Sequence, residues 1–236
     1  MLNIVTIANY YKNKGLEYLI EAVKDLPVTL DIIGDGDYKP NLKGVSNVNL
    51  LGYIPDAYKL LPEYDLYVCS SIKEEAPFSI LEAMRAGLPI VSTNVGSIPE
   101  MLKECGILFM PKDVKELKYH ISYFIDNPEV AKSIGKNAKE RQAKLYTKER
   151  MLKLAEDLHE ILEKNIKKRP IIVQTNHGLP YKEDIAFYKK IVWKWLCKRA
   201  YKKCDHVICL SEISKQEMID DGLTTEDKIT VIYNGI

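Results

Sequence analysis

Short apolar runs alternate along the chain with segments in which apolar residues recur at helical spacing. The apolar runs are typical of buried strands, and they lie at 2–7, 28–33, 47–52, 65–69 and 106–109. The helical spacing predicts helices at 16–23, 56–61, 78–86, 114–125, 130–145 and 147–166. Strands that alternate with helices are typical of α/β proteins, so we predict a doubly wound parallel sheet.

Residues 64–100 contain one complete strand–loop–helix–strand unit. The strand at 65–69 ends at Ser70 and Ser71, a polar loop follows, and Gly87 is a natural stop for the helix. In open parallel sheets, ligands bind at the loops that follow the carboxyl ends of the strands. The loop after Ser71 is therefore the first candidate site.

Two carboxylates occur in this unit, Glu74 in the loop and Glu82 in the helix. Both can face one crevice, where each would accept hydrogen bonds from sugar hydroxyls. The backbone amides of Phe78 and Ser79 lie at the helix N-terminus, a position that favours phosphate binding. The competing interpretation is structural: a capping acid at Glu74 and a solvated helix face at Glu82.

The surrounding residues resemble a known signature. An E-x7-E spacing (the EX7E motif), followed by A-M-x-A-G-x-P-I-V and then G-S-I-P-E, is similar to the donor site of GT-B fold retaining glycosyltransferases of the family 4, or group 1, type. The resemblance covers residues 1–166 and implies a Rossmann-like domain that binds a nucleotide-diphosphate sugar. It also implies that Glu74 contacts the hydroxyls of the donor sugar and Glu82 those of the ribose.

The same resemblance assigns residues to the donor diphosphate. Lys14 matches the lysine of the family's K-G pair, which neutralises the diphosphate. The family usually has an arginine five residues earlier, where this chain has the uncharged Asn9. A loop that commonly carries two glycines against the diphosphate and the sugar has Gly96 and Ser97 here.

Asp35 and Asp37 form a D-x-D pattern, which elsewhere holds a metal on a nucleotide diphosphate. In this position it resembles the G-D-G turn of GT-B donor domains, where no metal is needed. Glycine supplies backbone freedom in such a turn and aspartate supplies local hydrogen bonds, so we favour a structural turn. We accordingly expect no metal and no cofactor.

Residues 170–236 resemble the second half of the family's acceptor domain, which normally precedes the donor domain. The resemblance rests on T-x-H-G at 175–178, a later strand at 205–211, and the N-G-I that ends 228–236. It implies a half Rossmann-like β-α-β-α-β unit and places His177 against the donor sugar. The two blocks therefore resemble a circular permutation, with the first half of the acceptor domain missing.

A half sheet of this kind would leave its inner strand with an unpaired edge. We expect this edge to pair with another chain, either a separate first half or a second copy. The alternative is a self-contained half domain packed on the donor domain. A natural chain and a split or engineered one would explain the order of the blocks equally well.

The predicted helix at 184–203 is strongly basic, with no acidic residue after Asp184. Phe187, Ile191, Trp195 and Leu196 form an apolar stripe, with Trp193 at its margin. A basic amphipathic helix can bind an anionic membrane peripherally. The alternative, which we favour from sequence, is a solvated basic face above a stripe that joins the core. No motif supports nucleic-acid binding.

Composition narrows the class of protein without identifying it. The 236 residues have a formal net charge of +1, which implies neither disorder nor bulk affinity for nucleic acid. The 5 cysteines form no C-x-x-C pair, and an odd number argues against a disulfide framework. No apolar segment approaches a membrane span, and the N-terminus lacks a signal-peptide pattern. We expect a cytoplasmic protein.

The sequence therefore predicts a retaining hexosyltransferase of the GT-B type, which transfers a sugar from a nucleotide-diphosphate sugar to a lipid-linked or saccharide acceptor. The alternative is a non-catalytic or split nucleotide-sugar-binding module that needs a partner chain for activity. An epimerase or phosphorylase relative is a third interpretation, but no pyridoxal-phosphate lysine motif is present.

Overall fold

The computed structural model describes residues 1–165, 172–179 and 187–236. Contacts divide the chain into two compact units, one formed by residues 1–145 together with Ile236 and the other by residues 146–235. The predicted boundary at 166–170 lies later, because helix α6 groups with the second unit. Each unit is described by itself.

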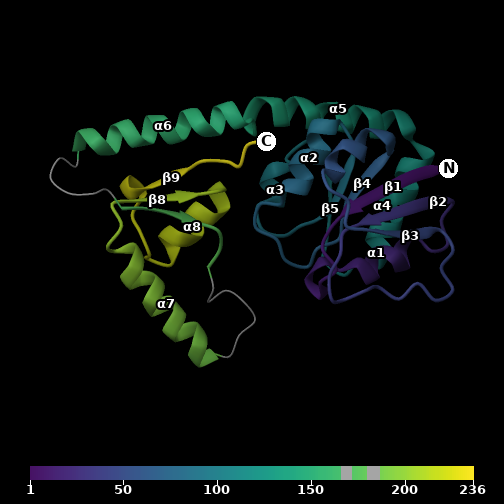
Figure 1. Cartoon of the computed structure of the whole chain (residues 1–236), viewed down its shortest axis with the longest axis horizontal. Helices are drawn as coiled ribbons and strands as arrows, with labels where there is room; N and C mark the ends of the chain where they lie inside the picture. Colours follow the sequence, from purple (N-terminus) through teal and green to yellow (C-terminus); the bar gives the residue numbers. More distant parts are fainter. Residues whose placement is uncertain (166–171, 180–186) are drawn as a thin grey trace. The chain divides into compact units, whose positions relative to one another are not determined.

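The first unit alternates strands and helices as the sequence predicts (Figure 1). Its strands are β1 Leu2–Ile7, β2 Val28–Ile33, β3 Val48–Gly52, β4 Leu66–Cys69, β5 Ile90–Thr93 and β6 Ile107–Phe109. Its α-helices are α1 Leu16–Val23, α2 Phe78–Ala86, α3 Ile98–Met101, α4 Val114–Asp126 and α5 Pro128–Leu145, and its 3-10 turns are η1 Lys12–Lys14 and η2 Ala57–Glu63.

The six strands pair in parallel in the order β3-β2-β1-β4-β5-β6. The order reverses between β1 and β4, so the chain winds outward in both directions from this point. Helices α1 and α4 pack together, as do α2 and α5. The predicted doubly wound α/β fold is confirmed, and in such sheets the strand-order reversal marks the ligand crevice.

The core of this unit consists of aliphatic side chains from the strands and the inner faces of the helices. Ile4, Leu30 and Leu66 are fully buried in the sheet, with Leu19 of α1 and Ile121 of α4 against them. The near-continuous apolar strands follow from this burial, because a parallel sheet is covered by helices on both faces.

A glycine fixes a close approach between the loops that follow β1 and β2. Gly34 follows β2 with φ 152°, and a Cβ atom there would lie 2.1 Å from the carbonyl oxygen of Ala8. Asp35 accepts a hydrogen bond from the amide of Gly36 at 2.8 Å, which is local turn geometry. Among the described residues no cluster of three metal-ligating side chains occurs.

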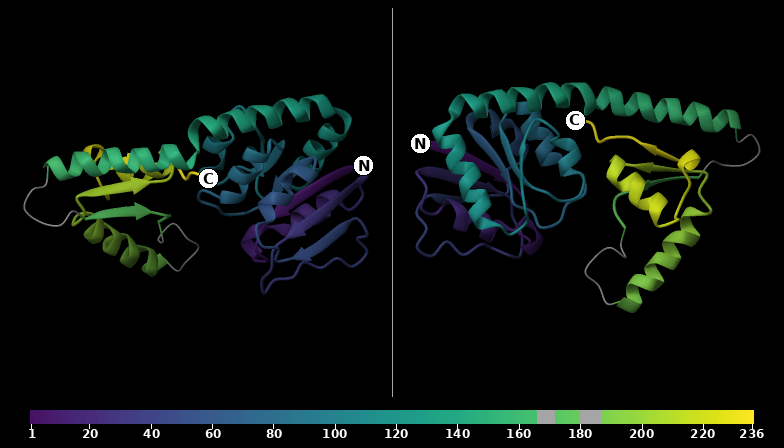
Figure 2. Two further views of the ribbon diagram at one scale, coloured as in Figure 1. Left: turned by 45° about the horizontal axis from the view of Figure 1, so that its top comes forward. Right: turned by 180° about the vertical axis from the view of Figure 1, so that it is seen from behind.

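The second unit contains a three-stranded parallel sheet in the order β7-β8-β9. Its elements are α6 Lys148–Asn165, β7 Val173–Asn176, α7 Phe187–Tyr201, β8 His206–Cys209, α8 Glu212–Asp220, η4 Glu226–Lys228 and β9 Ile229–Val231 (Figures 1 and 2). This confirms the predicted half Rossmann-like unit. Ile166, Ile171 and Asp184, which the predicted elements include, lie outside the described residues.

Two apolar clusters hold the second unit together. Leu158 and Leu162 of α6 pack with Ile232, while Val207, Met218 and Tyr201 form a cluster with residues of α8 and the strands. His206 is buried and its Nε2 lies 2.9 Å from the hydroxyl of Thr230, so its role is structural, as the sequence indicates. None of the described helices combines the length and apolar character needed to cross a bilayer.

The apolar stripe predicted for the helix at 184–203 does not join the core. Ile191 and Trp195 are each 57% exposed and Leu196 is 41% exposed. From α7 only Tyr201 and Cys197 reach the apolar cluster of the described second unit. The sequence interpretation that placed the stripe in the core is therefore wrong for these three residues, because the described side chains of α7 that contact the core come from another face of the helix.

Candidate functional site

A pocket opens at the carboxyl ends of β1, β2 and β4 in the first unit. Its walls contain residues from each of the loops that follow these strands and from the start of α2. The lining includes five of the site residues that the sequence predicts: Asn9, Lys14, Glu74, Phe78 and Ser79. The predicted site and the strand-order reversal therefore coincide.

Lys14 and Glu74 form an ion pair inside this pocket. The distance from Lys14 Nζ to Glu74 Oε1 is 2.5 Å, and the side chains are only 21% and 14% exposed. Ser71 donates a second hydrogen bond to the same carboxylate oxygen at 2.8 Å. The Glu74 carboxylate is thus held by a cation from one loop and a hydroxyl from another, and its direction is fixed.

Local hydrogen bonds explain why these two loops meet. The amide of Ile72 donates to the carbonyl of Asn13 at 2.7 Å, and the Ser70 hydroxyl donates to the carbonyl of Lys14 at 2.9 Å. Gly15 sits against the carbonyl oxygen of Ser70, where a Cβ would approach to 2.4 Å. Lys14 therefore reaches Glu74 because the backbone of η1 is bonded to the end of β4.

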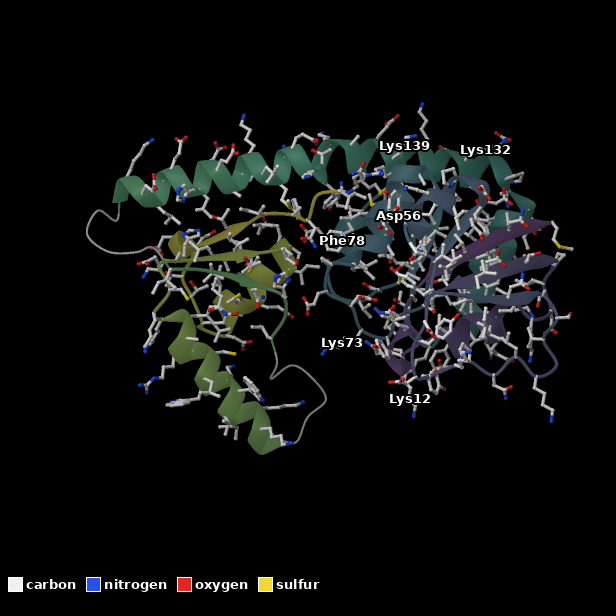
Figure 3. All side chains as sticks on the ribbon, viewed as in Figure 1. Lys12, Asp56, Lys73, Phe78, Lys132 and Lys139 are labelled. Carbon is white, nitrogen blue, oxygen red and sulfur yellow. The ribbon has the colours of Figure 1, made fainter. Side chains whose placement is uncertain are left out.

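Helix α2 begins at the pocket. Its N-cap residue is Pro77, which makes no side-chain cap hydrogen bond, and its first residues are Phe78 and Ser79. The first amides of an α-helix have no partner within the helix, and the helix dipole adds partial positive charge there. Phe78 is 52% exposed (Figure 3), so the approach to this end is open. The arrangement suits an anionic ligand.

Glu82 lies further along α2, half-buried, and does not line the pocket. Burial raises the pKa of its carboxyl, and the nearby Arg85 offsets part of this rise. The structure thus brings Glu74 to the pocket wall and leaves Glu82 beyond it.

Gly96 and Ser97 support the loop that carries Glu74. A Cβ at Gly96 would lie 2.1 Å from the carbonyl oxygen of Glu74. The amide of Ser97 donates to the carbonyl of Glu75 at 2.9 Å, and the Ser97 hydroxyl donates to the same carbonyl. Ser97 is buried. These two residues fix the position of the loop, and the diphosphate contact expected for them stays a prediction.

His177 follows β7 in the second unit and its side chain is exposed. Its predicted contact with the donor sugar involves a pocket of the other unit and stays a prediction.

Several lining residues were missed by the sequence reasoning. Thr6, Tyr53 and Tyr67 line the pocket, and Ser71 orients Glu74. Ser71 and Tyr53 each follow a predicted strand, so the rule that ligands bind at strand ends could have found them. Burial raises the pKa of the Tyr67 hydroxyl, which keeps that group neutral.

The comparisons with known proteins concern mainly the unit that holds this pocket. A family model described as glycosyl transferases group 1 matches residues 2–127, more than half of the chain. The chain belongs to this family. A second model, described as glycosyltransferase family 4, matches residues 157–236 of the same chain, which is called the group 1 chain below.

Two curated relatives illustrate the similarity. The sulfoquinovosyl transferase of Arabidopsis thaliana is 30% identical over 155 residues, which are 60% of this chain and 30% of that protein. The alpha-monoglucosyldiacylglycerol synthase of Acholeplasma laidlawii is 30% identical over 184 residues, 70% of this chain and 45% of that protein. The group 1 chain spans less than half the length of the curated relatives it matches.

Solved structures share the fold. Anabaena HepE in complex with UDP-glucose superposes with a TM-score of 0.57 at 24% identity, over 61% of this chain and 44% of that one. The sucrose-phosphate synthase of Thermosynechococcus elongatus gives a TM-score of 0.65 at 22% identity, over 70% and 46%. At these identities the likeness establishes the Rossmann-like GT-B fold.

Proposed function

We propose that the group 1 chain binds a nucleotide-diphosphate sugar in the pocket at the ends of β1, β2 and β4, and that it serves a retaining glycosyl transfer. The observation that carries the proposal is the Lys14–Glu74 pair at the N-terminus of α2. One cation and a helix N-terminus suit the diphosphate, and one oriented carboxylate suits sugar hydroxyls. Binding of UDP-glucose and UDP by HepE supports the class of ligand.

In the proposed reaction the bond between the anomeric carbon and the diphosphate breaks, the oxygen of the acceptor hydroxyl bonds to the same face of that carbon, and the hydroxyl proton passes to the departing diphosphate. Negative charge develops on the departing diphosphate. Lys14 and the amides of Phe78 and Ser79 would stabilise this charge, because they are fixed in position before the reaction. Glu74 would orient the sugar in the pocket, and His177 would contact the sugar from the acceptor side. Glu82 lies outside the pocket lining, so it would contact the ribose only where the nucleoside extends beyond that lining. The proposed reaction uses neither a metal nor a cofactor.

Calorimetric titration with UDP-glucose and GDP-mannose tests the donor site. The substitution Glu74→Gln removes the charge that the hydroxyls bond to, so we expect affinity to fall by about 10- to 150-fold, the usual range for a hydrogen bond to a charged group. Glu140→Gln, on the exposed face of α5, is the matched control. Unchanged affinity in a Glu74→Gln/Glu82→Gln double variant would refute the proposal.

A second candidate is a split module that needs a partner chain for turnover. The observation that favours it is the position of β7, which in the described residues pairs with β8 alone. Val173 on this strand is 41% exposed and Ile172 beside it 48%. An open parallel strand presents unpaired amides and carbonyls that another strand can bond to. We propose as its partner a first-half β-α-β-α-β unit or a second copy.

Measurement of the mass in solution, together with transfer assays, separates these candidates. A complex of two chains, or activity that appears only when a first-half partner is added, supports the split module. A monomer that transfers sugar alone supports the complete enzyme. A monomer that binds the donor and does not transfer with any partner leaves only a binding module.

A further inference from the structure

Helix α7 exposes an apolar face to solvent in the second unit. Ile191 and Trp195 are each 57% exposed, Val192 53%, Trp193 45% and Leu196 41%. Contiguous exposed apolar residues of this size are unusual on a soluble surface and mark a site of interaction. Trp193 and Trp195 are also the only 2 tryptophans of the whole chain.

The helical geometry separates this face from the core. Cys197 and Tyr201 are one turn apart and are the residues of α7 that reach the described core of the second unit. At 3.6 residues per turn, Trp195 and Val192 lie on the opposite side of the helix. Val192 and Trp195 therefore point away from the core of the second unit. Trp193, one turn before Cys197, lies instead on the same side of the helix as the core residues.

The same helix and the residues that follow it carry a concentrated positive charge. The cations are Lys189, Lys190, Lys194, Lys198, Arg199, Lys202 and Lys203, and no acidic residue occurs from 187 to 203. Lys194 is paired with Asp221 at 2.7 Å on the flank nearest the core. Arg199 lies 5.6 Å from the Trp195 ring centroid, so cations and apolar groups share the outward face.

We propose that this outward face of α7 docks on an anionic lipid surface. Tryptophan is enriched at the membrane–water interface, and lysine and arginine beside it are attracted to anionic headgroups. Lys189 and Lys198 lie at the two margins of the outward stripe, which consists of Ile191, Val192, Trp195 and Leu196. An anionic lipid surface satisfies both the apolar and the cationic groups. The proposal does not depend on the donor pocket, which lies in the other unit.

Tryptophan fluorescence of the full chain tests the docking directly, because both tryptophans are on α7. With vesicles of phosphatidylcholine and phosphatidylglycerol, the tryptophan emission should shift to shorter wavelength and the protein should co-sediment with the vesicles. Vesicles of phosphatidylcholine alone should do neither. Salt at about 1 M, where the Debye length is about 3 Å, should release most of the bound protein.

Two pairs of variants identify the face. Lys198→Glu/Arg199→Glu should weaken partition by at least about 25-fold, since each basic residue near the surface contributes about fivefold. Lys132→Glu/Lys136→Glu on the exposed face of α5 makes the same change of charge elsewhere (Lys132 is labelled in Figure 3). Ile191→Glu/Leu196→Glu should abolish the emission shift, whereas Leu152→Glu/Ile161→Glu on α6 should not.

Three results would overturn the proposal. Equal binding to neutral and anionic vesicles would remove the role of the charge. The absence of any emission shift with anionic vesicles would remove the contact itself, and this test needs no variant to fold. A shift that grows with protein concentration in the absence of lipid would show that a second copy covers α7. Loss of donor binding would leave all three results unchanged.

Discussion

Helix α5 approaches the C-terminal end of α2 at a glycine. A Cβ atom at Gly135 would lie 2.2 Å from the carbonyl oxygen of Gly87 and 3.0 Å from the amide nitrogen of Pro89. Gly87 is the left-handed C-cap residue of α2, with φ 81°. The substitution Gly135→Ala therefore brings a methyl group against backbone atoms that have no rotamer by which to move away.

Two opposing effects decide the sign of this change. Alanine in a helix interior is favoured over glycine by about 0.8–1.0 kcal/mol. Contact at ordinary van der Waals distance would require α5 to move outward by about 1 Å, and overpacking of this kind costs about 1–3 kcal/mol or more. Ala131 and Ala138, buried on the same face of α5, would lose their contacts in such a movement. We expect net destabilisation of about 1–2 kcal/mol.

Urea denaturation followed by circular dichroism measures this effect. For a unit of this size, about 1–2 kcal/mol corresponds to a fall in Tm of roughly 2–8 °C. Asn137→Ala, at an exposed position of the same helix, is the control, because it changes helix propensity without a clash and should stabilise slightly. An increase in the stability of Gly135→Ala equal to that of the control would refute the close approach of α5 to α2.

Three further predictions concern the site and the pH dependence. Gly96→Ala places a side chain at φ +55° and 2.1 Å from the Glu74 carbonyl, so titration calorimetry should show at least tenfold weaker donor binding; unchanged affinity would contradict the loop packing. Burial raises the pKa of Glu82, so the folded state holds its proton longer than the unfolded one. The contribution of Glu82 to stability should therefore fall as the pH rises above about 4.5. The substitution Glu82→Gln should make the urea midpoint less dependent on pH in that range. Burial lowers the pKa of His206, so the contribution of this residue to stability should be fully present above about pH 6.5 and be lost as the pH falls through the lower pKa of the folded state. The substitution His206→Gln should remove this pH dependence.

The arrangement of the first unit could be predicted because its pattern is local. Buried strands appear as uninterrupted apolar runs, whereas helices show apolar residues at helical spacing between polar ones. The elements predicted around the pocket agree with β1, β2, β4 and α2. Lys14 and Glu74 are 60 residues apart in sequence, yet both follow strands that end at one edge of the sheet. Their proximity follows from the topology.

Other features depend on tertiary contacts that no periodicity reports. The sequence shows a stripe of Ile191, Trp195 and Leu196 and cannot show whether a core is available to receive it; in the second unit Tyr201 and Cys197 occupy that place. The hydrogen bond from the Ser97 hydroxyl to the carbonyl of Glu75 could not be predicted from the sequence either, because it joins two loops that meet only after the sheet forms.

The contact between Lys14 and Glu74 has a consequence for selectivity. A cation that is already neutralised attracts anions weakly, so we expect inorganic phosphate and carboxylates to bind weakly in the pocket. A molecule that offers phosphate oxygens to the lysine and hydroxyl groups to the glutamate replaces both halves of the contact at once. We therefore expect the pocket to favour a ligand that carries both chemical groups over a ligand that carries only one of them.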